Sequence, residues 1–132
     1  MEKRDIMQYS PLALAFMGDA VYEQKAREKI ILSGNRSANE LHKLAVKKVC
    51  AEYQAEAVKM LNEKGFLTDE EQDILRRGRN AGGVCAPKHS TVTQYRAATG
   101  LECLFGFLYL MGDQERINEI FEMIWEMDFP EK

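Results

Sequence analysis

The chain has 132 residues, of which 45% are apolar and 30% are charged. This length fits one domain of about 100 to 150 residues. The composition excludes a disordered tail, and it excludes a membrane span, which needs roughly 18 or more consecutive apolar residues. The first residues lack the apolar stretch of a secretory signal or anchor, so we expect a cytoplasmic protein without membrane association. The widely spaced Cys50, Cys85 and Cys103 match no disulfide framework or metal motif and are expected to be reduced.

Charge is unevenly distributed along the chain. The formal net charge is -3, yet residues 74–101 contain no acidic residue and five basic ones, Arg76, Arg77, Arg79, Lys88 and Arg96. Residues 102–132 contain eight acidic residues and two basic ones. Because local potential governs the encounter with a polyanion, the basic segment predicts a nucleic-acid contact. A solvated loop is the alternative interpretation of the same segment.

The first half of the chain carries two helix-start signals. Ser10-Pro11 places a capping residue before a proline at the first helical position, which predicts a helix to about Leu32. Ser37-x-x-Glu40 is a capping box followed by apolar residues at steps of three and four. This pattern predicts one long amphipathic helix that ends at Gly65.

The second half repeats these signals. A capping box, Thr68-x-x-Glu71, predicts a short helix that runs into the basic stretch 76–80. A loop containing glycines and a proline follows, and helices are predicted from about Ser90 to Met111 and from Asp113 to Met127. No alternating strand pattern of useful length is present, so we expect an all-α bundle of five to six helices around one core.

Two carboxylates stand alone in the most apolar segments. Asp19 is the only charged residue between Ser10 and Tyr22, and Glu102 is the only one between Ala97 and Gly112. An unpaired carboxylate in such a helix costs several kcal/mol or becomes protonated, so a compensating cation is expected. An arginine is one candidate and Mg²⁺ is the other, because hard oxygen ligands from two helices suit this ion.

Glycines and a second acid accompany these two carboxylates. Gly18 and Gly106 each lower helix propensity by about 1 kcal/mol, which is easier to understand if helices or a ligand approach closely there. Glu23 is a candidate third ligand, and a surface ion pair with Arg27 is its alternative role. His42 and His89 lack the neighbours of a hydrolase triad or zinc site, and no phosphate-binding glycine motif occurs.

Residues 14–23 (LAFMGDAVYE) and 99–110 (TGLECLFGFLYL) resemble the two signature helices of the ribonuclease III catalytic domain. Further segments resemble the short branch of that family, Mini-ribonuclease III. They are Leu41-His-Lys, Ala51-x-x-Gln54-Ala, Arg76-Arg-Gly-Arg-Asn-Ala, Pro87-Lys88 and Tyr95-Arg-x-x-Thr-Gly-x-Glu. These segments occur in the family's order along nearly the whole chain.

The resemblance implies an all-helical homodimer with one endonuclease domain over residues 1–132 and no separate double-stranded RNA-binding domain. It implies Mg²⁺-dependent hydrolysis of double-stranded RNA that leaves 5′-phosphate and 3′-hydroxyl ends. For the short branch it implies maturation of the bacterial large-subunit (23S) ribosomal RNA precursor, with a ribosomal protein as a candidate partner that shapes the substrate.

The acidic pattern is shorter than that of the full-length enzymes. Their Glu-x-x-x-Asp and Asp-x-x-Glu read here as Ala15-x-x-x-Asp19 and Thr99-x-x-Glu102, and the short branch keeps the same two acids. Asp19 and Glu102 are therefore the expected catalytic residues and Mg²⁺ ligands. Thr99 is a candidate outer-shell residue alongside Glu23, and a hydroxyl that serves its own helix backbone is the alternative.

The expected RNA-binding residues lie on the basic segment and its flanks. They are Arg76, Arg77, Arg79, Asn80, Lys88, Tyr95 and Arg96. The competing interpretation of the chain is a non-catalytic helical RNA-binding or scaffolding dimer, in which Asp19 and Glu102 belong to buried ion pairs.

Overall fold

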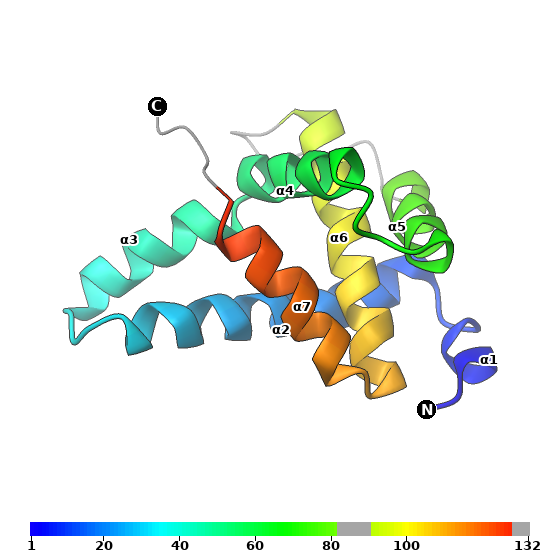
Figure 1. Ribbon diagram of the computed structural model, residues 1–132, viewed down its shortest axis with the longest axis horizontal. Helices are drawn as coiled ribbons and strands as arrows, with labels where there is room; N and C mark the ends of the chain where they lie inside the picture. Colours follow the sequence, from blue (N-terminus) through cyan, green and yellow to red (C-terminus); the bar gives the residue numbers. More distant parts are fainter. Residues whose placement is uncertain (82–90, 128–132) are drawn as a thin grey trace.

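The computed structural model describes residues 1–81 and 91–127, and every regular element within those ranges is an α-helix (Figure 1). The helices are α1 (Lys3–Ile6), α2 (Pro11–Leu32), α3 (Ala38–Val49), α4 (Ala51–Glu63), α5 (Asp69–Ala81), α6 (Val92–Met111) and α7 (Gln114–Trp125). The predicted all-α class is confirmed. No helix in the described ranges has the length and apolar character to cross a membrane. Cys50 and Cys103 are free thiols, and Cys85 lies outside the described residues.

The predicted capping residues start the helices where the sequence places them. The Ser10 hydroxyl oxygen accepts a hydrogen bond from the Ala13 amide at 3.1 Å, ahead of Pro11. Both bonds of the second capping box form, because the Thr68 amide donates to Glu71 at 2.9 Å and the Glu71 amide donates to the Thr68 hydroxyl at 3.1 Å. The resulting α5 is longer than expected, since it continues through the basic stretch as far as Ala81.

The single long helix predicted from Ser37 to Gly65 is wrong. The chain adopts an extended conformation at Cys50 (φ -67°, ψ 155°), which ends α3 and begins α4. The periodicity of apolar residues continues across Cys50, so pattern alone gives no sign of the break. The break is stabilised by side chains of the folded structure that bond the carbonyls at the end of α3, the Tyr22 hydroxyl among them at 2.7 Å from the Lys48 carbonyl oxygen.

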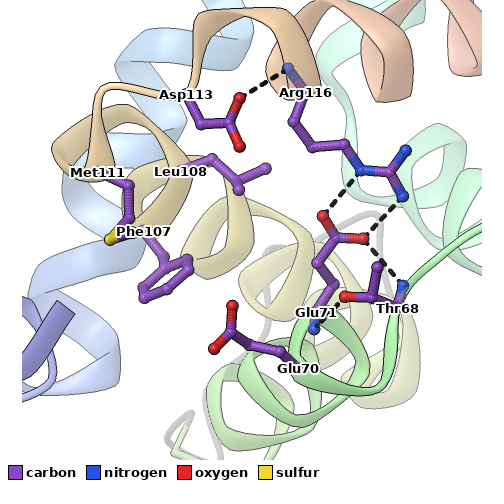
Figure 2. A pocket seen from close by; sticks show the side chains of 8 residues that line it. All are labelled: Thr68, Glu70, Glu71, Phe107, Leu108, Met111, Asp113 and Arg116. Atoms are coloured by element: carbon purple, nitrogen blue, oxygen red, sulfur yellow. Dashed lines mark hydrogen bonds and ion pairs between the residues drawn. The ribbon is translucent and has the colours of Figure 1, made fainter.

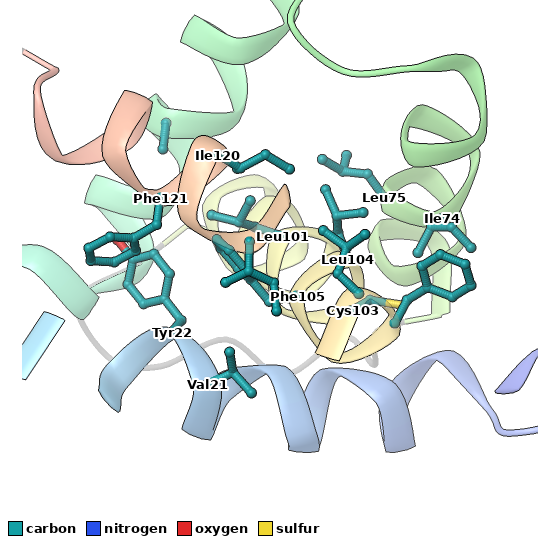
Figure 3. Packing of buried hydrophobic residues seen from close by; sticks show 14 of the residues in the cluster. Val21, Tyr22, Ile74, Leu75, Leu101, Cys103, Leu104, Phe105, Ile120 and Phe121 are labelled. Carbon is teal, nitrogen blue, oxygen red and sulfur yellow. The ribbon is translucent and has the colours of Figure 1, made fainter. Parts of the chain in front are cut away.

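Helix α6 lies at the centre of the molecule and contacts α2, α4, α5 and α7 (Figures 1 and 3). Its buried residues include Leu101, Leu104 and Phe105, which face the other helices across the core. The Tyr22 ring of α2 packs against Phe105 and against Phe121 of α7, with ring centroids 5.5 and 5.6 Å apart. Burial of these large side chains against α6 is the main favourable contribution to folding.

Helices α2 and α6 cross in backbone contact at two glycines. A Cβ atom built on Gly18 would lie 1.6 Å from the Glu102 carbonyl oxygen, and one on Gly106 would lie 1.9 Å from the Leu14 carbonyl oxygen. Real Cβ atoms do not approach other atoms so closely, so no larger residue fits at either position. The close approach predicted from these glycines is confirmed, and it places Asp19 beside the turn of α6 that carries Glu102.

We predict that Gly18→Ala destabilises the protein although alanine is the better helix former. Helix propensity alone would add about 1 kcal/mol of stability, whereas separating α2 from α6 costs about 2 to 3 kcal/mol as an overpacking change. Urea denaturation measures the free energy of unfolding. Gln24→Ala, at an exposed position on the same helix, is the control and should change it by less than about 0.5 kcal/mol. Equal stability of Gly18→Ala and wild type would contradict the backbone contact.

Candidate active site at the crossing of α2 and α6

The two predicted catalytic carboxylates meet at the helix crossing. Glu102 is half-buried and Asp19 lies at the surface. Burial is the largest cause that raises the pKa of Glu102. The charge of Asp19 and a side-chain hydrogen bond with Asp19 raise this pKa further, to about 8. A hydrogen bond from Gln54 opposes this shift only in part. The site therefore holds a carboxyl group that is difficult to ionise unless positive charge is supplied.

The positive charge does not come from an ion pair within the described residues. Neither Asp19 nor Glu102 forms a salt bridge there, so the buried ion-pair alternative finds no support. No group of three or more histidine, cysteine, aspartate or glutamate side chains is gathered in residues 1–81 and 91–127 either. Two carboxylates are nevertheless sufficient for Mg²⁺, which is bound through one or two of them and keeps several waters.

Gln54 also lies at this crossing, although in the sequence it stands out only as part of the Ala51-x-x-Gln54-Ala segment. It is 1% exposed, and its Nε2 donates to Glu102 Oε2 at 3.2 Å. Its carbonyl oxygen is buried and finds no hydrogen-bond donor in the described part of the chain. An acceptor of this kind fits a hydrated cation, whose waters are donors. The available signal was a polar residue between Ala51 and Val58, on the apolar stripe of its helix.

Asp19 is less buried than the apolar segment around it suggested. Helix α2 buries one side, with Leu14, Ala15 and Val21, and exposes another. On the exposed side Phe16 is 83% exposed and Leu12 is 48% exposed. Asp19 shares that side, because residues separated by three, four or seven positions face the same direction on a helix. The high apolar content of 12–22 therefore reflects two apolar faces, only one of which packs in the core.

The two predicted outer-shell residues have other partners in this structure. The Thr99 hydroxyl donates to the Tyr95 carbonyl oxygen at 2.9 Å, one turn earlier in α6. Glu23 accepts hydrogen bonds from Arg27 at 2.5 and 2.9 Å on the surface of α2. Both arrangements match the alternatives given for these residues. An additional role near a bound cation stays a prediction for each of them.

The described members of the predicted RNA-binding set lie on helices α5 and α6. A Cβ on Gly100 would lie 2.6 Å from the Leu75 carbonyl oxygen, so α5 also packs backbone-close against α6. This contact brings the basic end of α5 against the part of α6 that precedes Glu102. Tyr95 and Arg96 lie on the first turns of α6 and are half-buried.

The basic side chains differ in their availability. Arg79 and Asn80 are exposed near the end of α5. Arg76 forms an ion pair with Asp73, and Arg77 is half-buried with a guanidinium nitrogen 3.6 Å from Met7 Sδ. Lys88 lies outside the described residues. Of the described residues of this set, Arg76, Arg79 and Asn80 are exposed, and the exposed Arg76 is paired with Asp73.

A pocket lies near the end of α6, and its lining contains none of the predicted site residues (Figure 2). Arg116 lines this pocket and donates hydrogen bonds to both Glu71 carboxylate oxygens at 2.8 Å and to the Phe66 carbonyl oxygen at 2.7 Å. Burial alone would raise the pKa of Glu71, but the contacts with Arg116 and the hydrogen bonds with Thr68 together lower it. Because these bonds occupy the guanidinium, the cluster serves to join α5 to α7.

Comparison with known proteins gives one consistent result. The family model for the Ribonuclease III domain matches residues 12–113. The chain is 47% identical to a Mini-ribonuclease 3 of Thermoanaerobacter sp. over 93% of its own length and 85% of that protein. It is 42% identical to a Mini-ribonuclease 3 of Staphylococcus aureus over 87% and 86% of the two chains. A crystal structure of a protein from Fusobacterium nucleatum superimposes with a TM-score of 0.81 at 33% identity, covering 90% of this chain and 95% of that one.

We predict that the metal-free protein loses stability as pH rises from about 5 to 8. The ordinary pKa of a glutamate is about 4.5, and that of Glu102 is about 8 in the folded chain. Within this window the unfolded chain has lost the proton that the folded chain keeps, so the free energy of unfolding falls with pH. The slope is at most about 1.4 kcal/mol per pH unit. Urea denaturation in EDTA at pH 5, 6.5 and 8 measures it.

The Glu102→Gln variant tests whether this pH dependence of stability comes from Glu102 and not from other titrating groups. The amide cannot titrate and imitates the protonated carboxyl, so this variant should lose the slope and be more stable than the wild type at pH 8 in EDTA. Glu28→Gln, at an exposed position of α2, should keep the wild-type slope. The account is contradicted if Glu102→Gln and the wild type show the same pH dependence.

Proposed function

Because this chain belongs to the ribonuclease III family, we propose that it cleaves double-stranded RNA with Mg²⁺ held by Asp19 and Glu102. The chain is an endoribonuclease, and the products of its family carry 5′-phosphate and 3′-hydroxyl ends. The observation that carries the proposal is the carboxylate pair at the α2–α6 crossing, where burial and mutual repulsion hold the pKa of Glu102 near 8. A divalent cation is the simplest way to stabilise the ionised form of Glu102 at neutral pH.

The two carboxylates have distinct tasks in this proposal. Glu102 is half-buried and hydrogen-bonded to Gln54, so it provides the fixed ligand, whereas Asp19 at the surface provides a ligand that RNA can approach. When bound, Mg²⁺ supplies an activated water and stabilises the charge that develops during in-line attack on a phosphodiester. The chain itself contributes the positions of the two carboxylates and the Gln54 amide that is hydrogen-bonded to Glu102.

Arg79 and Asn80 are proposed to contact the RNA backbone, with Arg76, Arg77 and Arg96 as further phosphate contacts. Duplex RNA is recognised mainly by its shape and by phosphate and 2′-hydroxyl contacts. The packing of Gly100 of α6 against α5 supports this role, because it holds the basic end of α5 against the helix that carries Glu102. Lys88 and Tyr95 stay predicted contacts of the same surface.

The enzyme is proposed to act as a homodimer. Helix α2 exposes an apolar face of Leu12, Ala13, Phe16 and Ala20. A contiguous exposed apolar face marks an interaction surface in soluble proteins. A second copy seated on this face lies beside Asp19, and a twofold axis then provides two sites for the two strands of a duplex.

The substrate is proposed to be the large-subunit ribosomal RNA precursor, processed in the cytoplasm where bacterial ribosomes assemble. The identity to Mini-ribonuclease 3 proteins supports this assignment to the short branch of the family. Of the basic residues between 74 and 101 that the structure describes, only Arg76 and Arg79 are exposed, so a ribosomal protein that shapes the RNA is the proposed partner. Equal cleavage rates on protein-free precursor and on precursor bound by ribosomal proteins would exclude that partner.

We predict that Asp19→Asn lowers duplex cleavage in Mg²⁺ on the order of 1,000-fold without weakening duplex binding. Asparagine keeps the size of the side chain and removes the charge that holds the cation. Gel assays on a long RNA duplex, with single-stranded RNA and EDTA as controls, measure cleavage, and a filter-binding assay in EDTA measures affinity. Arg79→Ala should show the opposite pattern, with a raised KM and a smaller effect on kcat.

A scaffold function would give a different result in the same experiment. In that case neither the wild type nor Asp19→Asn cleaves the duplex with or without Mg²⁺, although both bind it. Full cleavage by Asp19→Asn would instead show that Mg²⁺ is held elsewhere.

We predict that Phe16→Glu converts the enzyme to a monomer. The substitution puts a charge at the centre of the apolar face of α2, and burying an unpaired charge in an interface costs several kcal/mol. Sedimentation velocity measures the oligomeric state. Leu32→Glu is the matched control, because Leu32 is 78% exposed at the far end of the same helix. A dimeric Phe16→Glu variant, or a monomeric wild type, would contradict the proposed interface.

A further inference from the structure

The break between α3 and α4 leaves backbone carbonyls without the amide partners that a continuous helix would provide. In an uninterrupted helix, the carbonyls of Lys47, Lys48 and Val49 would accept from amides four residues later. Here each of them accepts from a side chain instead. Cys50 Sγ lies 3.7 Å from the Lys47 oxygen, the Tyr22 hydroxyl is 2.7 Å from the Lys48 oxygen, and Gln54 Nε2 is 2.9 Å from the Val49 oxygen.

Gln54 stands out because its amide group serves two acceptors at once. Besides the Val49 carbonyl oxygen, its Nε2 reaches Glu102 Oε2 at 3.2 Å. A primary amide has two N–H donors, and both are used here. The orientation of the amide is also defined, since the opposite orientation would place its oxygen against two acceptors. The side chain that makes these two bonds is only 1% exposed.

We propose that Gln54 is a positioning residue that holds the Glu102 carboxylate in the orientation needed to bind the divalent cation. One N–H anchors the amide to the backbone at the α3–α4 break, and the other holds Glu102. The carboxylate orientation is thereby tied to rigid backbone and not left to side-chain rotation. This proposal rests on the proposed role of Asp19 and Glu102 as metal ligands.

A capping role alone does not account for these contacts. A cap at the end of α3 needs only the bond to Val49, and it could be made by a side chain at the surface. Gln54 is instead buried beside a carboxylate of the site, where partners that orient metal ligands commonly change metal affinity or activity by 10- to 100-fold when removed. The break in the long helix thus has a consequence for the active site.

The test is Gln54→Met, which keeps the length of the side chain and removes both donors. Mn²⁺ alone, titrated without RNA and followed by the electron paramagnetic resonance signal of the free ion, reports metal affinity independently of activity. We expect Mn²⁺ affinity to fall about 10- to 100-fold, the Mg²⁺ concentration for half-maximal cleavage to rise in parallel, and duplex binding in EDTA to stay unchanged. Gln54→Asn, whose shorter amide cannot reach both acceptors, should change affinity in the same direction.

Tyr53→Phe is the matched control for a loss of stability. Tyr53 is buried in the same helix, and its hydroxyl donates to the Ile124 carbonyl oxygen at 3.1 Å. This variant should lower the melting temperature and keep wild-type Mn²⁺ affinity. The positioning role is overturned if both Gln54 variants bind Mn²⁺ as the wild type does, or if Tyr53→Phe loses affinity equally. A wild type that neither binds Mn²⁺ nor cleaves duplex RNA would instead overturn the proposed function.

Discussion

The backbone contact between α2 and α6 is the constraint on which the rest of the structure depends. Gly18 and Gly106 allow the two helices to cross at a distance that no side chain permits. This contact brings Asp19 and Glu102 together although both are acids. Burial, and after it the charge of Asp19, raises the pKa of Glu102 to about 8. Burial and the neighbouring charge thus make Glu102 difficult to ionise in the folded protein, as is common for carboxyl groups at functional sites.

The other features of the site follow from how helices are packed around α6. Helix α5 approaches it closely at Gly100, which orients the basic residues at the end of α5. Helix α4 is turned at Cys50, and Gln54 reaches Glu102 from there. The Arg116–Glu71 pair joins α7 to α5 (Figure 2). The proposed catalytic groups therefore lie on helices that are held in place by backbone contacts and buried hydrogen bonds, as precise positioning requires.

Local signals predicted local features of this chain well. The serine and threonine caps, the helix starts at Pro11 and Asp69, and the close approach at Gly18 each depend on a few neighbouring residues. The features that sequence analysis missed depend on distant residues. The α3–α4 break is supported by Tyr22, which lies far from it in the sequence. Both faces of α2 carry apolar residues, so the exposed face can be told from the buried one only when the packing of α6 against α2 is known. The proposed role of Gln54 depends on its hydrogen bond to Glu102, 48 residues later in the chain.

The central claim is that the helix crossing forms a divalent cation site between Asp19 and Glu102. A crystal structure of the wild-type protein grown with Mn²⁺, with data collected at a wavelength where manganese scatters anomalously, tests it most directly. The account predicts an anomalous peak within coordination distance of both carboxylates, on the Gln54 side of the crossing. No peak there at saturating Mn²⁺, or a peak bound only by other residues, would contradict it.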